Sequence, residues 1–341
     1  MSHSPSPSSV LILGARGRFG SAAVHAFAQA GWQVHAQMRP GATPPPAAPG
    51  VQWLLADPDD TAALAAAAKG AAVVVQGLSP LYTHKVWRTE VPRLTNAAIA
   101  ITRELRTTLM LPASVYNFGE GMPARLLEDT PQNATTFMGR MRIASEALVR
   151  EATLDGGMKA VVIRGGNFFG SGSGSWLDLV MAKDIQKGRL SYPGAANVPV
   201  SWAYLPDMAR SFVDVANRRE ALPGFEALHF AGHTLTQQDW VDALDEIAWE
   251  RGWLPESGRL QVKAMSWPLL RALGLFMPTL AAICEMRYLW RVPHGLVNRR
   301  MAALAGPEAH TPFEKALRTS LDELGMVQGR ASRPAADLAR A

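Results

Sequence analysis

The fold of this chain is decided by residues 10–20, which read VLILGARGRFG. The four apolar residues at the start predict a strand that is buried on both faces. Three glycines follow, and good helix formers then run from Ser21 to a stop at Gly31. A strand that turns over glycines into a helix brings free backbone N–H groups and the positive end of a helix to one point. Such a point suits a pyrophosphate, so the stretch predicts a nucleotide-binding site.

The glycine spacing is G-x-x-G-x-x-G, which differs from the G-x-G-x-x-G of the simplest dinucleotide fingerprint. A glycine turn before a helix can also be no more than a tight connection. Here the strand before the turn and the helix after it supply the context that a cofactor loop needs. The predicted cofactor loop comprises Gly14, Arg16, Gly17, Arg18, Phe19 and Gly20.

Composition indicates a globular protein, because 48% of the 341 residues are apolar and 18% are charged. The net charge of +5 raises the question of an anionic partner, but lysine and arginine are scattered, so we expect no nucleic-acid partner. Cys284 is the single cysteine, which excludes an intrachain disulfide and fits a reducing, cytoplasmic compartment. The histidines show no metal-ligand spacing, and no metal is predicted.

Two segments bear on targeting and membranes. Residues 1–9 are rich in serine and proline and lack the pattern of a signal peptide, so they predict a disordered tail. The most apolar stretch is 272–284, which Pro278 interrupts and which is too short to span a bilayer. We expect a buried or domain-capping helix there rather than a membrane contact, and no integral membrane segment.

Strands and helices alternate along the first half of the chain. Further strands are predicted at 33–38, 51–55, 71–76, 107–111 and 159–163, and helices at 61–69, 85–104 and 134–152. Alternation at this spacing predicts parallel pairing with right-handed crossovers. The expected fold class is therefore α/β, with a doubly wound, Rossmann-type parallel sheet and the cofactor at the carboxyl ends of its strands.

The alternation loosens beyond Ser175. Helices are predicted at 176–187 and 205–218, a short strand at 227–230, and mostly helix after Thr236. We assign 10–169 to an NAD(P)-binding core that is completed by about 204–232. A smaller, mostly helical substrate or lid region is assigned to 170–203 and 233–341.

Several landmarks occur in an order that resembles the extended short-chain dehydrogenase/reductase superfamily, which includes nucleotide-sugar epimerases and dehydratases. After the glycine motif they are Ser114-Val115-Tyr116, Glu128-Asp129-Thr130-Pro131, Arg164-Gly165-Gly166-Asn167-Phe168-Phe169-Gly170 and Tyr204-Leu205-Pro206-Asp207-Met208-Ala209. Together they cover about Val10 to His233. The resemblance implies a nicotinamide cofactor and a small-molecule substrate, and a homodimer is considered as well.

The catalytic residues of that superfamily are a serine and a Tyr-x-x-x-Lys pair, and this chain departs from both. When Tyr116 is laid on the family's V-Y anchor, the serine, tyrosine and lysine positions hold Pro112, Phe137 and Met141. None of the five tyrosines is followed four residues later by lysine, so the pair is absent in every register. The catalytic residues are therefore unknown. Substitutes considered near the pocket are Tyr116, Arg140 and Arg142, although for each of them a structural role in a loop or on a helix surface is the favoured explanation.

The end of the second strand predicts which cofactor is preferred. It carries Arg39 and no acidic residue, and an arginine there suits the 2′-phosphate of NADP(H) rather than the free ribose of NAD. The resemblance implies that Asp57 contacts the adenine ring, with a helix cap as the alternative. The chain is expected to pass under the cofactor at the end of the fourth strand, at Gln76, Gly77 and Leu78.

Large apolar groups are frequent in the segments expected to face the cleft. The predicted substrate pocket comprises Asn167, Phe168, Phe169, Trp176, Trp202 and Tyr204. Such a lining favours an apolar or aromatic ligand over a nucleotide sugar, although the same aromatics are also explained as the core of the lid. We therefore expect an NADP-dependent oxidoreductase that acts on an apolar small molecule. A non-catalytic NADP-binding sensor and a nucleotide-sugar epimerase/dehydratase-like enzyme are the alternatives.

Overall fold

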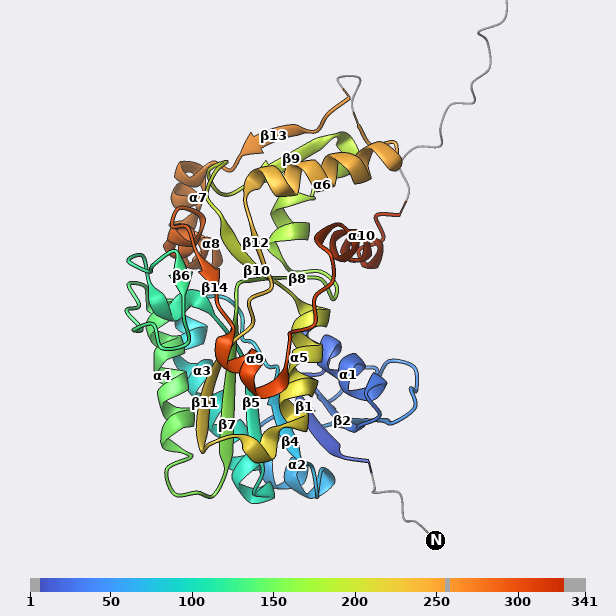
Figure 1. The fold of residues 1–341 in the computed structure, drawn as a ribbon, viewed down its shortest axis with the longest axis vertical. Coiled ribbons are helices and arrows are strands. Elements are labelled where there is room, and N and C mark those ends of the chain that lie inside the picture. The colour runs from blue at the N-terminus through green and yellow to red at the C-terminus, as the bar shows by residue number, and fades with distance from the viewer. Residues whose placement is uncertain (1–6, 255–257, 328–341) are drawn as a thin grey trace, which may run out of the picture.

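The computed structural model describes residues 7–254 and 258–327. Its centre is a parallel sheet of seven strands in the order β11-β7-β5-β4-β1-β2-β3 (Figure 1). The strands are β1 (Ser9–Leu13), β2 (Gln33–Met38), β3 (Val51–Leu55), β4 (Val73–Gln76), β5 (Thr108–Ser114), β7 (Lys159–Gly165) and β11 (Phe225–His229). The strand order reverses between β1 and β4, which is where such sheets bind nucleotides. The predicted doubly wound α/β fold is confirmed.

Helices cover both faces of this sheet. One face is covered by α1 (Arg18–Gln29) and α5 (Leu205–Asn217), and the other by α2 (Thr61–Ala67), α3 (His84–Leu105) and α4 (Phe137–Glu151). The side chains of β1 divide between them, because Val10 and Ile12 pack toward the first face and Leu11 and Leu13 toward the second. Residues 10–13 are fully buried, as the apolar run predicts.

A second layer lies above the carboxyl ends of the strands and forms the lid (Figure 1). It contains a sheet of β8 (Asn167–Phe169), β10 (Val200–Tyr204) and β12 (His233–Leu235), and β9 (Arg189–Tyr192) paired with β13 (Gln261–Ala264). The helices α6 (Gln237–Glu250) and α10 (Phe313–Glu323) enclose an aromatic core in which the rings of Trp202 and Trp240 lie 4.6 Å apart. The chain then returns to the lower layer, where α9 (Arg299–Ala305) contacts α5 and β11.

Two predictions for the second half of the chain differ from the structure. The helix predicted at 176–187 is instead a π-helical turn, Leu177–Met181, and a 3-10 turn, Ile185–Lys187. The N–H of Ala182 donates to the carbonyl oxygen of Leu177, five residues back, and this wider turn ends the first segment.

Of the predicted N-terminal tail, residues 1–6 lie outside the described residues, and Ser9 already begins β1.

A single buried or domain-capping helix is predicted at 272–284, and the structure differs in that the helix is broken and its middle is exposed. These residues form the end of α7 (Trp267–Gly274), a turn and α8 (Pro278–Glu285), because Pro278 starts a new helix. Leu275 and Phe276 in the turn are 81% and 85% exposed. Across 7–254 and 258–327, no helix combines the length and the apolar character needed to cross a membrane.

Candidate functional site

The glycine loop packs so closely against β4 that side chains are excluded. Gly14 has a φ of +72°, and a Cβ there would lie 2.9 Å from the backbone nitrogen of Leu78. A Cβ on Gly20 would lie 2.1 Å from the carbonyl oxygen of Gly14, and one on Gly77 would lie 2.9 Å from that of Leu13. The loop therefore brings bare backbone to the carboxyl ends of β1 and β4.

The N-terminus of α1 is prepared for an anion. Gly17 precedes the helix, no side chain in the described part of the protein caps it, and its first turn carries no acid. The first N–H groups of a helix have no partners inside the helix and lie at the positive end of its dipole. These features and the glycine cradle fit the pyrophosphate of a dinucleotide.

Gln37 holds the glycine loop in place and was not singled out from the sequence. Its side chain is fully buried, with Oε1 accepting from the N–H of Gly14 at 2.8 Å and Nε2 donating to the carbonyl oxygen of Ala56 at 2.7 Å. The sequence feature that could have identified Gln37 is a glutamine near the end of a strand that lies beside the glycine loop. Because Gln37 is engaged internally, Arg39 is the next side chain on β2's exit that can face a ligand.

The three arginines predicted at the cofactor occupy two environments. Arg16 and Arg39 are exposed beside the glycine loop and the end of β2. Arg18 is half-buried, and burial lowers the pKa of its guanidinium group. Its guanidinium donates hydrogen bonds across the cleft to the carbonyl oxygens of Phe168 (3.2 Å), Gly170 (3.0 Å) and Gly174 (3.4 Å). A 2′-phosphate role therefore remains a prediction for Arg16 and Arg39, while the side chain of Arg18 joins α1 to the lid.

Two other predicted cofactor residues occupy distinct surroundings. Asp57 is exposed after β3, and its Oδ1 accepts from the N–H of Asp59 at 3.0 Å, while the residue before α2 is Asp60. Asp57 thus shapes a turn rather than capping α2, and its adenine contact stays a prediction. The ring of Phe19 packs against Phe212 of α5, with centroids 4.8 Å apart.

A cavity of about 870 Å³ extends from the glycine loop to α7 and α8. The predicted residues Gln76, Gly77 and Leu78 line its cofactor end, and Asn167, Phe168 and Trp176 line its lid side. The other three predicted pocket residues, Phe169, Trp202 and Tyr204, lie in the aromatic core of the lid. The large cavity therefore combines the cofactor cradle with a mainly apolar chamber.

Two tyrosines and an arginine, here called the tyrosine–arginine cluster, line this cavity. The side chains of Tyr82, Tyr116 and Arg142 lie near one another, and the guanidinium of Arg142 lies 4.8 Å from the ring centre of Trp87. Burial raises the pKa of Tyr82 well above its usual value and lowers that of Arg142. Of the predicted substitutes, Tyr116 and Arg142 thus face the cavity, whereas Arg140 is exposed on the surface of α4.

The positions of the usual triad hold no acid–base group. Pro112 lines the cavity, while Phe137 and Met141 pack at the edge of a neighbouring apolar cluster. The N–H of Phe137 donates to the carboxylate of Glu285, and its ring lies 5.1 Å from that of His84. Phe137 is therefore a packing residue between α4 and α8.

Several buried polar atoms of the cavity wall have no hydrogen-bond partner within residues 7–254 and 258–327. They are Ser114 Oγ, Arg142 Nε, Asn167 Nδ2, Arg18 Nε and Trp87 Nε1. Buried polar atoms are usually paired, so these atoms point to a bound ligand. The sequence marked Ser114, the last residue of β5, only as a landmark and did not mark Tyr82, which lies in the connection that follows β4.

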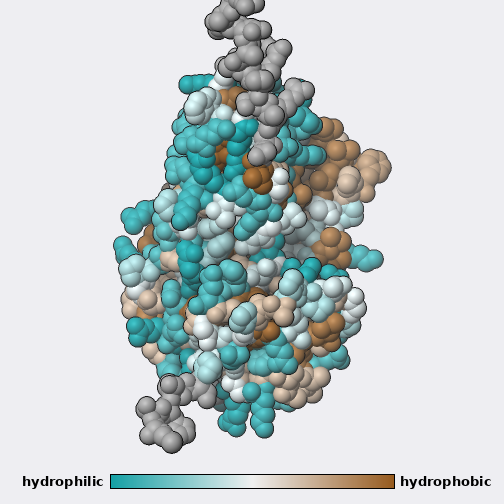
Figure 2. Space-filling model, turned by 90° about the vertical axis from the view of Figure 1, so that its right-hand side faces the viewer, coloured by the Kyte–Doolittle hydropathy of each residue, from teal (hydrophilic) through white to brown (hydrophobic). Residues whose placement is uncertain are grey.

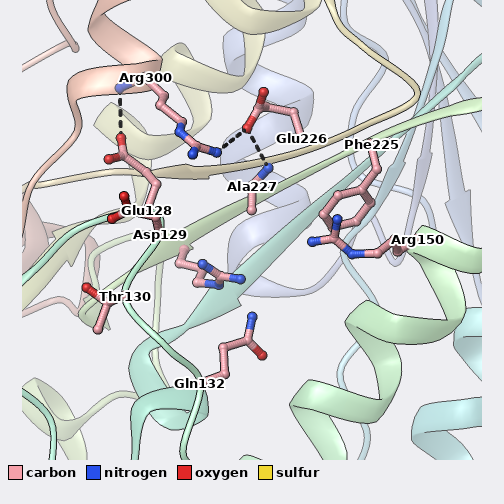
Figure 3. Close-up of a pocket in the computed structure, with 10 residues that line it drawn as sticks. Glu128, Asp129, Thr130, Gln132, Arg150, Phe225, Glu226, Ala227 and Arg300 are labelled. Carbon is pink, nitrogen blue, oxygen red and sulfur yellow. Dashed lines mark hydrogen bonds and ion pairs between the residues drawn. The ribbon is translucent and has the colours of Figure 1, made fainter.

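A smaller pocket of about 290 Å³ lies apart from the cofactor cradle, between α4, β11 and α9 (Figure 3). In this pocket Arg300 Nη1 lies 3.1 Å from Glu226 Oε1, and the guanidinium of Arg150 lies over the ring of Phe225, 4.0 Å from its centre. The landmark Glu128 accepts from the N–H of Arg300 at 2.8 Å. The E-D-x-P landmark therefore braces the fold here.

Comparisons with known proteins agree with this architecture. The family model described as "NAD dependent epimerase/dehydratase family" matches residues 10–229. A search of the curated proteins finds no match.

Solved structures share the fold over almost the whole chain. L-threonine dehydrogenase from Clostridium difficile has a TM-score of 0.72 at 16% identity and covers 94% of this chain and 98% of its own. UDP-glucose 4-epimerase from Brucella ovis, in complex with NAD, has a TM-score of 0.70 at 16% identity. The match covers 93% of this chain and 98% of the epimerase chain. A nucleoside-diphosphate-sugar epimerase from Pseudomonas aeruginosa has a TM-score of 0.68 at 18% identity. The match covers 94% of this chain and 97% of that epimerase chain. At these identities the likeness shows the fold alone.

Proposed function

The chain belongs to the NAD-dependent epimerase/dehydratase family, and from that premise we propose that it is an NADP(H)-dependent oxidoreductase that reduces an apolar small molecule. The observation that carries the proposal is one continuous cavity that joins the glycine cradle to an apolar chamber containing the tyrosine–arginine cluster. The enzyme works without the family's serine, tyrosine and lysine.

The glycine cradle and the free N-terminus of α1 support a dinucleotide, and a similar structure, the Brucella epimerase, is in complex with NAD. The exposed Arg16 and Arg39 and the absence of an acid at the end of β2 favour the 2′-phosphate of NADP(H). When bound, this cofactor supplies a hydride. The chain's own groups must orient the acceptor and stabilise the charge that the hydride leaves on it.

The tyrosine–arginine cluster suits an acceptor whose oxygen becomes negative. Hydride addition to an enone or a quinone leaves an enolate or phenolate, which Arg142 stabilises electrostatically in this mainly apolar cavity. The raised pKa of Tyr82 makes its hydroxyl a hydrogen-bond donor rather than a proton source. The proton that completes the reduction comes from solvent, so acceptors whose anions need little protonation are favoured.

Charge on the cavity wall argues against a nucleotide sugar as substrate. Among the described residues that line the cavity, the charged side chains are Arg18, Arg142 and Lys183. The guanidinium of Arg18 already binds three carbonyl groups, and Lys183 is exposed. A diphosphate is normally held by clustered arginine or lysine side chains, which this wall does not offer.

One specific observation favours a second candidate, a non-catalytic NADP-binding sensor. Pro112, Phe137 and Met141 stand where the family carries its acid–base groups, and the cofactor cradle is intact. A sensor would bind NADPH without consuming it in the presence of any acceptor. An enzyme would consume it, so the two functions are separated by turnover.

The test is NADPH oxidation followed at 340 nm with quinones and enones on one side and UDP- and GDP-sugars on the other. Arg142→Met is compared with Arg140→Met, which removes an exposed arginine from the same helix. We expect oxidation with apolar acceptors and a loss of kcat of about 100-fold in Arg142→Met, because an electrostatic group is removed. Unchanged kcat in Arg142→Met, or turnover with the sugars alone, would overturn the proposal.

A further variant separates packing from chemistry at the family's tyrosine position. Phe137 has no exchangeable proton, so Phe137→Leu is expected to change kcat by no more than about threefold, as a packing change does. If Phe137→Leu abolished turnover while the unfolding temperature and NADPH affinity were unchanged, Phe137 would have a chemical role that this account denies.

A further inference from the structure

The helical hairpin formed by α7 and α8 projects an apolar tip into solvent. In the turn between the helices, Leu275 is 81%, Phe276 85% and Met277 51% exposed. On α7, Leu269 and Leu273 are 57% and 41% exposed. Figure 2 shows a hydrophobic projection from the upper part of the molecule, at the height that α7 and α8 have in Figure 1. Contiguous exposed apolar side chains of this size mark an interaction surface.

The hairpin is a fixed structure and not a frayed end. Trp267 is buried at its base, and its indole N–H donates to the carbonyl oxygen of Pro193 at 2.8 Å. The helices meet closely, because a Cβ on Gly274 would lie 3.1 Å from the backbone nitrogen of Ala281. The base therefore holds the apolar tip in a defined position.

The cations of the hairpin segment are exposed, and its one acid is engaged elsewhere. From Ala264 to Cys284 the single charged residue is Arg271, which is exposed, and the exposed Lys263 immediately precedes the segment. Glu285, which ends α8, pairs with His84 and accepts from the N–H of Phe137, so its charge is directed toward α3 and α4. An apolar tip with exposed cations on the chain that leads to it is complementary to anionic lipid headgroups above acyl chains.

The other side of the hairpin faces the large cavity. Leu270, Leu280 and Ile283 line that cavity, while Leu269, Leu273 and the turn face solvent. A single pair of short helices thus lies between the apolar chamber and the exposed apolar surface. Each helix has eight residues and is about 12 Å long, which suits the shallow depth of an interfacial segment.

We propose that the α7–α8 hairpin docks the protein on an anionic lipid surface. Leu275, Phe276 and Met277 enter the interface, and Arg271 and Lys263 lie among the headgroups. The hairpin then sets the large cavity beside the bilayer, and delivery of an apolar substrate from the lipid by this route rests on the proposed function. The docking itself does not depend on catalysis.

The test is co-sedimentation of the full chain with vesicles of phosphatidylglycerol and phosphatidylethanolamine, compared with vesicles of phosphatidylcholine alone. The variant Leu275→Ser/Phe276→Ser is compared with Leu154→Ser/Leu81→Ser, which changes two residues that are 79% and 67% exposed elsewhere. We expect binding to the anionic vesicles, at least tenfold weaker binding in the hairpin variant, and unchanged binding in the control variant. Arg271→Gln is expected to weaken binding at low salt more than at high salt.

Three results would overturn the proposal: no binding of the wild-type protein to anionic vesicles, equal binding of the hairpin variant, or equal binding of all variants to neutral vesicles. A concentration-dependent dimer that the hairpin variant abolishes, together with no vesicle binding, would assign the tip to a second copy of the chain. Because sedimentation needs no turnover, failure of docking and failure of the proposed reaction are read separately. Unfolding temperatures confirm that both variants are folded.

Discussion

At Gly14, backbone conformation and close packing make the same demand. Its φ is +72°, and a Cβ would lie 2.9 Å from two atoms of Leu78. We expect Gly14→Ala to weaken NADPH binding at least tenfold, because the loop must move away from the position that fits the pyrophosphate. Fluorescence titration with NADPH measures the effect.

The matched control for that change is Gly70→Ala. Gly70 has a φ of +85°, but no atom lies within 4 Å of its Cβ position, so this variant carries the backbone strain without the clash. It should lose about 1–2 kcal/mol of stability and keep its NADPH affinity. Equal NADPH affinity in the two variants would contradict the placement of the cofactor over Gly14.

The predicted preference for NADPH over NADH depends on Arg39. Replacing it with glutamine should weaken NADPH binding about tenfold and leave NADH binding unchanged, because only NADPH carries the 2′-phosphate that an exposed guanidinium can bind. Arg125→Gln, which removes an exposed arginine from β6 (Arg125–Leu126), controls for net charge. Equal or tighter binding of NADH by the wild-type protein would refute the preference.

Arg18 connects two elements that lie far apart in the sequence. Its hydrogen bonds to the backbone of β8 and of the loop that follows it join the start of α1 to the lid over the cofactor cradle. Arg18→Met should remove them and keep much of the side-chain volume. We expect faster amide hydrogen exchange in residues 167–174 and a raised KM for the acceptor, with little change in exchange on α3. Unchanged exchange in 167–174 would show that Arg18 does not hold this loop.

Helices and strands with a clear local sequence pattern could be predicted, and those without one could not. Strands β2 and β3 occur at the predicted residues, because β2 (QVHAQM) alternates polar and apolar residues, β3 (VQWLL) is mainly apolar, and glycine and proline lie close to the ends of both. The α7–α8 hairpin could not be predicted as exposed, because its composition is that of a buried helix and only its place above the cavity decides its exposure. Ser114 and Tyr82 came together through β4 and β5, a tertiary proximity that no sequence spacing expresses.

The stability of the whole molecule is expected to depend on pH, because buried histidines bind protons more weakly in the folded state than in the unfolded state. His229 is fully buried, and burial, followed by the charge of Arg164, lowers its pKa to about 3. In the unfolded chain a histidine has a pKa of about 6.5, so below that value protons bind the unfolded state preferentially. The stability contributed by neutral His229 is therefore present above pH 6.5 and is lost as the pH falls toward 3.

We expect the free energy of unfolding to fall by about 1.4 kcal/mol for each pH unit between 6 and 4 on account of His229 alone. His233 and His294, whose pKa values burial lowers to about 4, act in the same direction. Urea unfolding at pH 6, 5 and 4 measures the slope, and His229→Gln should reduce it by that amount. An identical slope in the variant would mean that His229 is not held neutral by the fold.

The central claim, that this molecule transfers a hydride to an apolar acceptor, is tested most directly by following the hydride. The protein is incubated with a cyclic enone and NADPH that carries deuterium on one or the other face of the nicotinamide C4, and the product is analysed by mass spectrometry. If the protein transfers the hydride, deuterium from one face alone appears on carbon in the reduced product, and Arg142→Met slows its appearance. NADPH binding without deuterium in the product of any acceptor would contradict the claim and leave a cofactor-binding sensor in its place.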